Sequence, residues 1–148
     1  ERYTEGVNAL TDRINEKYGT QEWRPIKIFH ENNYTQAIAG MKLYDVLLVN
    51  SVIDGMNLVA KEGPVVNTKD GVLILSEGAG AYQQLAGGAL SVAPSDLEGT
   101  MQALYTALCM PEEERKERAQ HLITSIERED ARHWLQQQIK DVCELVQR

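Results

Sequence analysis

The sequence predicts an α/β domain with a mostly parallel, Rossmann-like sheet and flanking helices. Helical and strand-like segments alternate along residues 1–94, which is typical of βαβ units. Two strand-like segments, 46–49 and 72–75, are continuous apolar runs, as expected for strands buried on both faces of a parallel sheet. We therefore expect βα units over residues 1–94 and C-terminal helices over residues 95–148.

The first elements follow from apolar spacing and β propensity. Apolar residues recur at spacings of three and four within residues 1–18, which predicts a helix, and Gly19 is a suitable end for it. The Ile-Lys-Ile-Phe sequence at 26–29 is rich in β-forming residues and follows Pro25, so we expect a strand there. Residues 34–43 are expected to be helical.

The central elements place several loops at one edge of the predicted sheet. After the strand at 46–49, a helix is expected to begin near Met56, and 72–75 and 89–92 are the next strands. Ligands of parallel sheets bind beyond the carboxyl ends of the strands. The loops at this edge would be 30–33, 50–56, 76–81 and 93–95.

The C-terminal part is expected to consist of helices. Ser95 and Asp96 can cap one helix, and Pro111 is at a position that favours the start of another. Residues 127–148 carry an apolar stripe that we expect to pack in a core. The stripe consists of Trp134, Leu135, Ile139, Val142 and Val146.

Composition excludes some classes of function. The chain has 148 residues, of which 43% are hydrophobic and 25% charged, which is ordinary for a globular domain. Its net charge of −7 argues against a nucleic-acid partner, and no apolar run approaches the roughly 20 residues that span a membrane. Its two cysteines and three histidines lack metal-ligand spacing. We therefore expect a cytoplasmic protein with no metal and no cofactor.

The segment from Asp54 to Glu62 is the strongest candidate site, because it follows a buried strand and starts a helix. Gly55 would let the backbone approach a ligand closely. The free N–H groups at 56–59 would form an anion site at the helix N-terminus. Asp54 could accept hydrogen bonds from a polar ligand, and Glu62 could bind a pair of vicinal hydroxyls. A simpler interpretation makes Asp54 the helix cap and Glu62 a surface residue.

Four motifs resemble one known family, glycosyltransferase family 20, the trehalose-6-phosphate synthases. The sequence DGMNLVAKE at 54–62 is similar to the donor-binding signature of that family. RINEKYG at 13–19, and GVLILS at 71–76 followed by Ala79-Gly80-Ala81, are similar to two further segments. His133-Trp134 matches a His-Trp pair in the last helix. The resemblance covers essentially the whole chain.

The resemblance implies the donor-binding C-terminal half of a two-domain GT-B glycosyltransferase. Such enzymes transfer glucose from UDP-glucose, or another nucleotide-glucose, to glucose 6-phosphate with retention of configuration. It also implies nucleotide-sugar contacts from Asn32 and from the donor segment, which consists of Asp54, Gly55, Met56, Asn57, Leu58, Val59, Ala60, Lys61 and Glu62. No catalytic residue follows from the resemblance beyond a donor-sugar contact by Asp54.

Individual roles follow from the same resemblance. The backbone of Leu58 and Val59 would bind the diphosphate, and Glu62 the ribose. Asp54 would contact the donor sugar together with the backbone at 55–57. Main-chain groups near Asn32 would flank the uracil. Asn32 and Gly63 each stand where many members have an aromatic residue, which leaves the nucleotide preference open.

The resemblance also implies that parts of the enzyme are missing from this sequence. The Arg and Lys that grip the diphosphate have no counterpart, and neither does the acceptor domain. The first two strands of the domain are also absent; in the usual order they separate 26–29 from 46–49. We expect an inactive fragment that needs its N-terminal domain, another chain or a second copy. A transferase for another sugar or cyclitol phosphate, a non-catalytic nucleotide-sugar-binding fragment and a plain phosphate-binding module stay as alternatives.

Overall fold

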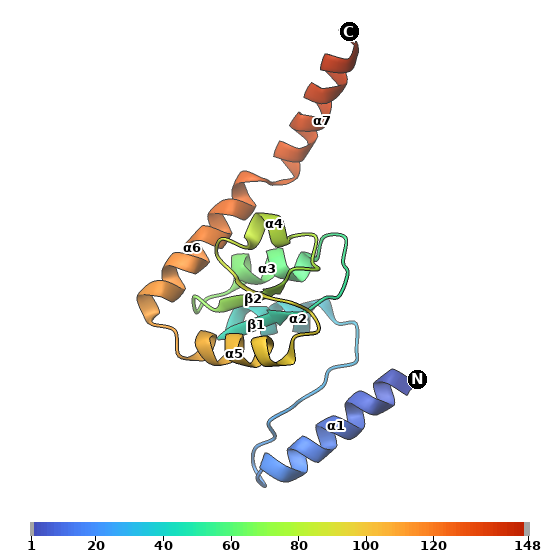
Figure 1. Ribbon diagram of the computed structural model, residues 1–148, viewed down its shortest axis with the longest axis vertical. Coiled ribbons are helices and arrows are strands. Elements are labelled where there is room, and N and C mark those ends of the chain that lie inside the picture. Colours follow the sequence, from blue (N-terminus) through green and yellow to red (C-terminus); the bar gives the residue numbers. More distant parts are fainter. Residues whose placement is uncertain (1, 147–148) are drawn as a thin grey trace. The chain divides into compact units, whose positions relative to one another are not determined.

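The computed structural model describes residues 2–146 (Figure 1). The chain divides into two compact units, residues 1–33 and residues 34–148. The first unit contains helix α1 (Arg2–Tyr18) and the extended segment that follows it. The helix ends at Tyr18, where predicted, and the N–H of Gly19 makes the last bond of the helical pattern, to the carbonyl of Asn15 at 2.8 Å.

The strand predicted at 26–29 is wrong. Residues 26–29 are extended but pair with no other strand in the described chain. The side chain of Asn15 takes the place of a neighbouring strand: its Oδ1 accepts the N–H of Ile26 at 2.9 Å, and its Nδ2 donates to the Ile26 carbonyl at 3.0 Å. β propensity was present here, but a strand also needs a partner, and a single carboxamide is enough to satisfy Ile26.

The second unit contains a three-stranded parallel sheet in the order β1-β2-β3. Strand β1 (Val46–Val49) and strand β2 (Val72–Ser76) were predicted from their apolar runs, and β3 (Leu90–Val92) is the short strand predicted at 89–92. Val46 lies opposite Val72, and Ile74 lies opposite Leu90. The predicted α/β class and parallel sheet are therefore confirmed.

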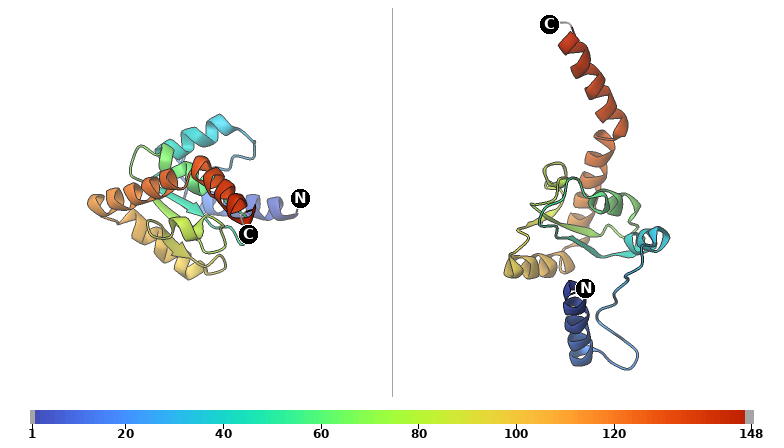
Figure 2. Two further views of the ribbon diagram at one scale, coloured as in Figure 1. Left: turned by 90° about the horizontal axis from the view of Figure 1, so that it is seen from above. Right: turned by 90° about the vertical axis from the view of Figure 1, so that its right-hand side faces the viewer.

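Helices connect the strands and follow the sheet. Their bounds are α2 (Tyr34–Leu43), α3 (Leu58–Val66), α4 (Tyr82–Leu85), α5 (Leu97–Leu108), α6 (Glu112–Arg128) and α7 (Ala131–Val146). The sheet lies between α5 on one face and α3, α4 and α6 on the other (Figures 1 and 2). Among residues 2–146, no helix is long and apolar enough to cross a membrane.

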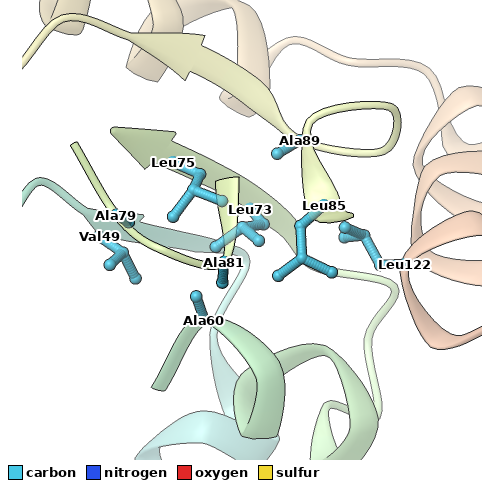
Figure 3. Close-up of a cluster of buried hydrophobic side chains, with 9 residues drawn as sticks. All are labelled: Val49, Ala60, Leu73, Leu75, Ala79, Ala81, Leu85, Ala89 and Leu122. Carbon is cyan, nitrogen blue, oxygen red and sulfur yellow. The ribbon is translucent and has the colours of Figure 1, made fainter. Parts of the chain in front are cut away.

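Strand β2 is at the centre of the core, and its side chains alternate between two buried clusters. One cluster faces α3, α4 and α6 (Figure 3) and consists of Val49, Ala60, Leu73, Leu75, Ala79, Ala81, Leu85, Ala89 and Leu122. The other faces α5 and consists of Val72, Ile74, Val92, Ala107 and Met110. All five residues of β2 are buried, as expected for a central parallel strand.

Strand β1, in contrast, lies at an edge of the sheet. Among the described residues it pairs only with β2, and the side chain of Leu48 is 39% exposed. An apolar stripe on α5 is also exposed and consists of Leu97, Met101, Tyr105 and Leu108. Asn50, which follows β1, lines the same hollow as Leu97 and Met101. The residue after β1 and the first part of the stripe therefore line one hollow.

The C-terminal helix differs from the prediction in two ways. It begins at Ala131, because the carboxylate of Asp130 caps it by accepting the N–H of His133 at 2.8 Å. Its apolar stripe was expected in a core, yet every described residue of α7 is exposed, Trp134 to 63%. Figure 2 shows α7 continuing from α6 away from the sheet. The spacing predicted the helix correctly, but spacing does not specify what a stripe packs against.

Candidate functional site

The candidate site is built from two loops at the carboxyl ends of β1 and β2. Because the strands are parallel, both loops leave the sheet at the same edge. The loops then continue side by side: Asp54 donates its N–H to the Gly78 carbonyl at 3.1 Å, and Gly80 donates to the Asp54 carbonyl at 2.8 Å. Ala81 donates to the Met56 carbonyl at 2.8 Å. Backbone pairing thus extends past the strands and fixes the loop that precedes α3.

Two glycines permit this close approach. A Cβ atom on Gly78 would lie 2.2 Å from the carbonyl oxygen of Val52, and one on Gly80 would lie 2.1 Å from that of Gly55. Both distances are far below van der Waals contact, and both neighbours are backbone atoms that a rotamer change cannot move. The glycines at 78 and 80 are therefore required for contact between the two loops.

Ser76 anchors the two loops to each other. Its side chain is completely buried. The hydroxyl donates to the Ser51 carbonyl at 2.6 Å and accepts the N–H of Gly78 at 2.9 Å. A buried hydroxyl is tolerated here because both its donor and its acceptor function are satisfied.

Asn57, and not Asp54, caps helix α3. Its backbone is left-handed, with a φ of 72°, and its Oδ1 accepts the N–H of Ala60 at 3.0 Å. The helix therefore begins at Leu58, two residues later than predicted. The prediction placed the cap too early because backbone bonds to the loop at 78–81 hold residues 54–56 outside the helix. Asparagine suits the position, since it tolerates the left-handed region and caps helices well.

The carboxylate of Asp54 is held from two sides. Its Oδ1 accepts the N–H of Met56 at 3.2 Å, and its Oδ2 accepts from Nδ2 of Asn57 at 2.9 Å. The hydrogen bond from Met56, followed by that from the Asn57 side chain, lowers the pKa of Asp54 below its ordinary value. The ionised carboxylate is an acceptor only, which suits a ligand that offers hydroxyl groups.

The N-terminus of α3 offers fewer free donors than predicted. The N–H of Met56 is not free, because it is bonded to Asp54. Leu58 and Val59 are the first two residues of α3, ahead of the first intrahelical hydrogen bond, and no acceptor in residues 2–146 takes up their N–H groups. Their side chains are exposed, whereas Ala60 is buried in the core. The anion-binding capacity of this helix end therefore rests on Leu58 and Val59.

The remaining candidates are more scattered. Lys61 and Glu62 are half-buried in the first half of α3, after the capped turn. Gly55 is exposed, with open space where a side chain would be. Asn32 is exposed and belongs to the other unit, residues 1–33, so the structure does not join it to the site. Within residues 2–146, no group of three or more His, Cys, Asp or Glu side chains is placed to hold a metal ion.

Sequence reasoning did not identify Ser51 and Ser76 as residues that hold the site loop in place. A serine at the end of an otherwise apolar buried strand was the available signal for Ser76. The side-chain function of Asn57 was missed as well, because the resemblance implied only backbone contacts there. Nothing in the sequence spacing indicates that these three residues meet Asp54 in one network.

A parallel sheet with helices on both faces places the chain in the class of Rossmann-like α/β proteins. A family model described as Glycosyltransferase family 20 matches residues 1–144. The chain belongs to glycosyltransferase family 20.

Similar proteins agree with this family. An alpha,alpha-trehalose-phosphate synthase [UDP-forming] of Pichia angusta is 39% identical over 92% of this chain and 29% of its own length. A trehalose-6-phosphate synthase of Sodalis glossinidius is 44% identical over 88% of this chain and 28% of its own length. The chain thus spans less than a third of these relatives.

Solved structures show the same relationship. The crystal structure of alpha,alpha-trehalose 6-phosphate synthase from Burkholderia multivorans superimposes with a TM-score of 0.87 at 33% identity, over 98% of this chain and 32% of that one. A structure from E. coli, described as bound with UDP-2-fluoro glucose, gives 0.84 at 35% identity, over 93% of this chain and 31% of that one. The fold described above is therefore a portion of the fold of these proteins.

Proposed function

We propose that this chain is the donor-binding part of a retaining glycosyltransferase that makes trehalose 6-phosphate from UDP-glucose and glucose 6-phosphate. The observation that carries the proposal is the paired loop at 54–57, which holds an ionised Asp54 beside the free N–H groups of Leu58 and Val59. The relatives are UDP-forming synthases, and one is described as bound to a UDP-sugar analogue.

In this proposal, different groups of the loop and helix contact different parts of the nucleotide sugar. The N–H groups of Leu58 and Val59 bind the diphosphate and stabilise the negative charge that UDP gains as it leaves. Asp54 accepts hydrogen bonds from hydroxyl groups of the donor sugar, and Glu62 accepts them from the ribose. Lys61 adds a cation close to the diphosphate, and the uracil contact near Asn32 rests on the family resemblance alone. No step of this scheme uses a metal or a cofactor.

Calorimetric titration with UDP, UDP-glucose and inorganic phosphate tests the proposal. We expect UDP and UDP-glucose to bind and phosphate alone to bind far more weakly, because the nucleoside supplies additional contacts. Equal affinity for phosphate and UDP would favour a plain phosphate-binding module instead. Glu62→Ala should weaken UDP binding about tenfold, since hydrogen bonds to a charged group are lost. The matched control is Glu98→Ala, an exposed glutamate on α5.

We expect the 148-residue chain alone to show no turnover with UDP-glucose and glucose 6-phosphate. The family resemblance assigns diphosphate contacts to an Arg and a Lys that have no match in this sequence, and the chain spans less than a third of its relatives. Release of UDP by the purified chain would contradict this expectation. The alternative is a transferase for another sugar or cyclitol phosphate, and a panel of acceptors tests it.

We further propose that another strand pairs with the free edge of β1. Edge strands are commonly protected by Lys, Pro or bulges, whereas β1 reads Val-Leu-Leu-Val. The exposed α5 stripe beside it adds apolar area that a partner would cover. The strand would come from an N-terminal domain, from another chain or from a second copy. Light scattering at high concentration tests the last of these, and a strictly monomeric chain would exclude it.

A further inference from the structure

Asn57 uses every hydrogen-bonding atom of its side chain. Oδ1 accepts the N–H of Ala60 at 3.0 Å. The two hydrogens of Nδ2 are shared between Oγ of Ser51 at 3.2 Å and Oδ2 of Asp54 at 2.9 Å. An Asn side chain has two donors and an acceptor oxygen with two lone pairs, so both donors of Asn57 are in use and one lone pair of Oδ1 remains. Both donors of the side chain therefore hold neighbouring residues of the site loop.

The residue that it holds most closely is the candidate contact to the donor sugar. One oxygen of Asp54 is fixed by the backbone of the same loop, at Met56, and the other by Asn57. Asn57 is in turn fixed by Ser51, whose carbonyl accepts from the buried hydroxyl of Ser76. The contacts run from the buried end of β2 through Ser51 to Asn57 and the carboxylate, and a weaker contact of the Ser51 side chain also lowers the pKa of Asp54.

We propose that Asn57 is a positioning residue, which orients the carboxylate of Asp54 toward the donor sugar while its cap on α3 leaves the N–H groups of Leu58 and Val59 free. This inference rests on the proposed function and adds a role for the Asn57 side chain. Loss of the side chain lets Asp54 rotate, so it weakens contacts to the sugar. The diphosphate contacts come from backbone groups outside the Asn57 network, and they are preserved.

The test is a double-mutant cycle with Asn57→Gly and Asp54→Ala, in which the Kd values of UDP and UDP-glucose are measured for the full chain. Glycine suits a φ of 72° and is a tolerated helix cap, so Asn57→Gly keeps the backbone conformation. We expect its UDP-glucose affinity to fall about fivefold and its UDP affinity to change by less than about twofold. In the Asp54→Ala background, Asn57→Gly should have no further effect on the preference for UDP-glucose.

A matched control is available at the other end of α3. Asn67 has a fully bonded side chain: it donates to the carbonyls of Met41 and Tyr44 and accepts from Lys69 and Gly71. Asn67→Gly should lower the stability of the fold without changing the ratio of the two Kd values. If Asn67→Gly changes the ratio as much as Asn57→Gly does, the effect is one of general destabilisation and the proposal is wrong.

A measurement without ligand completes the test. NMR titration should show the pKa of Asp54 rising toward its ordinary value in Asn57→Gly, because one of its hydrogen bonds is lost. Additive effects in the cycle, or an unchanged Asp54 titration, would overturn the positioning role and leave the proposed function intact. Failure of the unmutated chain to bind UDP would instead overturn the proposed function and this inference together.

Discussion

The two neighbouring strands β1 and β2 differ in how completely they are buried and hydrogen-bonded. Strand β2 is buried along its whole length, and the loop after it is bonded to the site loop through Ser76, Gly78 and Gly80. Strand β1 has a free edge, with exposed Leu48 beside the exposed stripe of α5. The same sheet thus contains a fully buried and paired strand next to a strand with an exposed, unpaired edge.

The difference shows which part of the function the chain can support by itself. Binding geometry depends on the loops at 51–57 and 76–81, and hydrogen bonds within this chain fix both of them. No strand within residues 2–146 pairs with the free edge of β1. We therefore expect donor recognition to be built in locally, and we expect the edge to be the place where additional structure matters.

The largest expected effect is on the core at β2. Leu73→Ala should lower the free energy of unfolding by about 4 kcal/mol, because it removes a fully buried side chain and leaves a cavity. Leu48→Ala on β1 should lower it by less than about 1 kcal/mol, because that side chain is partly exposed. Urea unfolding followed by circular dichroism measures both. Equal losses would remove the contrast between the two strands.

Gly80→Ala should have the next largest effect and lower the free energy of unfolding by about 3 kcal/mol. The added Cβ would lie 2.1 Å from the Gly55 carbonyl oxygen, so the two loops must separate. The control is Gly40→Ala within α2, where a Cβ meets no atom within 4 Å. That change should stabilise the helix by about 1 kcal/mol. A stable Gly80→Ala protein with unaltered UDP-glucose binding would show that the loops need not touch.

Ser76→Ala should lower the free energy of unfolding by about 2 kcal/mol, since it leaves the partly buried carbonyl of Ser51 and N–H of Gly78 without their partner. Ser91→Ala is the comparison, because Ser91 is exposed and accepts only from the hydroxyl of Tyr82. Thermal unfolding by calorimetry ranks the two. A loss at Ser76 no larger than at Ser91 would mean that water replaces the hydroxyl.

Leu48→Lys probes the edge with little effect on the fold. We expect stability to change by less than about 1 kcal/mol, while any self-association at high concentration is reduced, because a charged edge strand resists pairing. Light scattering over a concentration series gives the readout. If the unmutated chain associates and Leu48→Lys associates equally, a surface other than the β1 edge is responsible.

The smallest expected effect is the pH dependence that comes from Asp54. Its pKa in the folded chain is lower than its ordinary value of 3.8, mainly through the N–H of Met56. The ionised carboxylate of Asp54 therefore stabilises the folded chain fully above its unfolded-state pKa. This stabilisation is lost as the pH falls through the folded-state pKa. NMR titration of the carboxyl carbon measures the shift. A pKa at or above the ordinary value would show that the carboxylate is not held as described.

The sequence predicted the sheet well and the site loop less well, for physical reasons. Continuous apolar runs at 46–49 and 72–75 have few alternatives to buried strands. The run at 26–29 has similar propensity, but Asn15 satisfies the backbone of Ile26 from eleven residues away, which local patterns cannot show. Propensity therefore identified strands only where a neighbouring strand was also present.

At the site, the family motif selected nine residues as candidates, but it did not predict their arrangement. The cap lies at Asn57 because residues 54–56 pair with a loop that is more than twenty residues later in the chain. Such pairing depends on Gly78 and Gly80, whose role becomes apparent only when the two loops are seen together. Short-range spacing predicted a helix start near the right place, and tertiary pairing moved it by two residues.

Helix α7 has its own cap at Asp130 and places no residue in either core cluster. Its apolar side chains, among them Trp134 and Ile139, are therefore not maintained by any requirement of the folded sheet. Selection could preserve that stripe only through another benefit, such as a contact made in the working protein. The frequency of substitution at Trp134 and Ile139 among relatives, compared with the frequency at Leu73, would show how strong that benefit is.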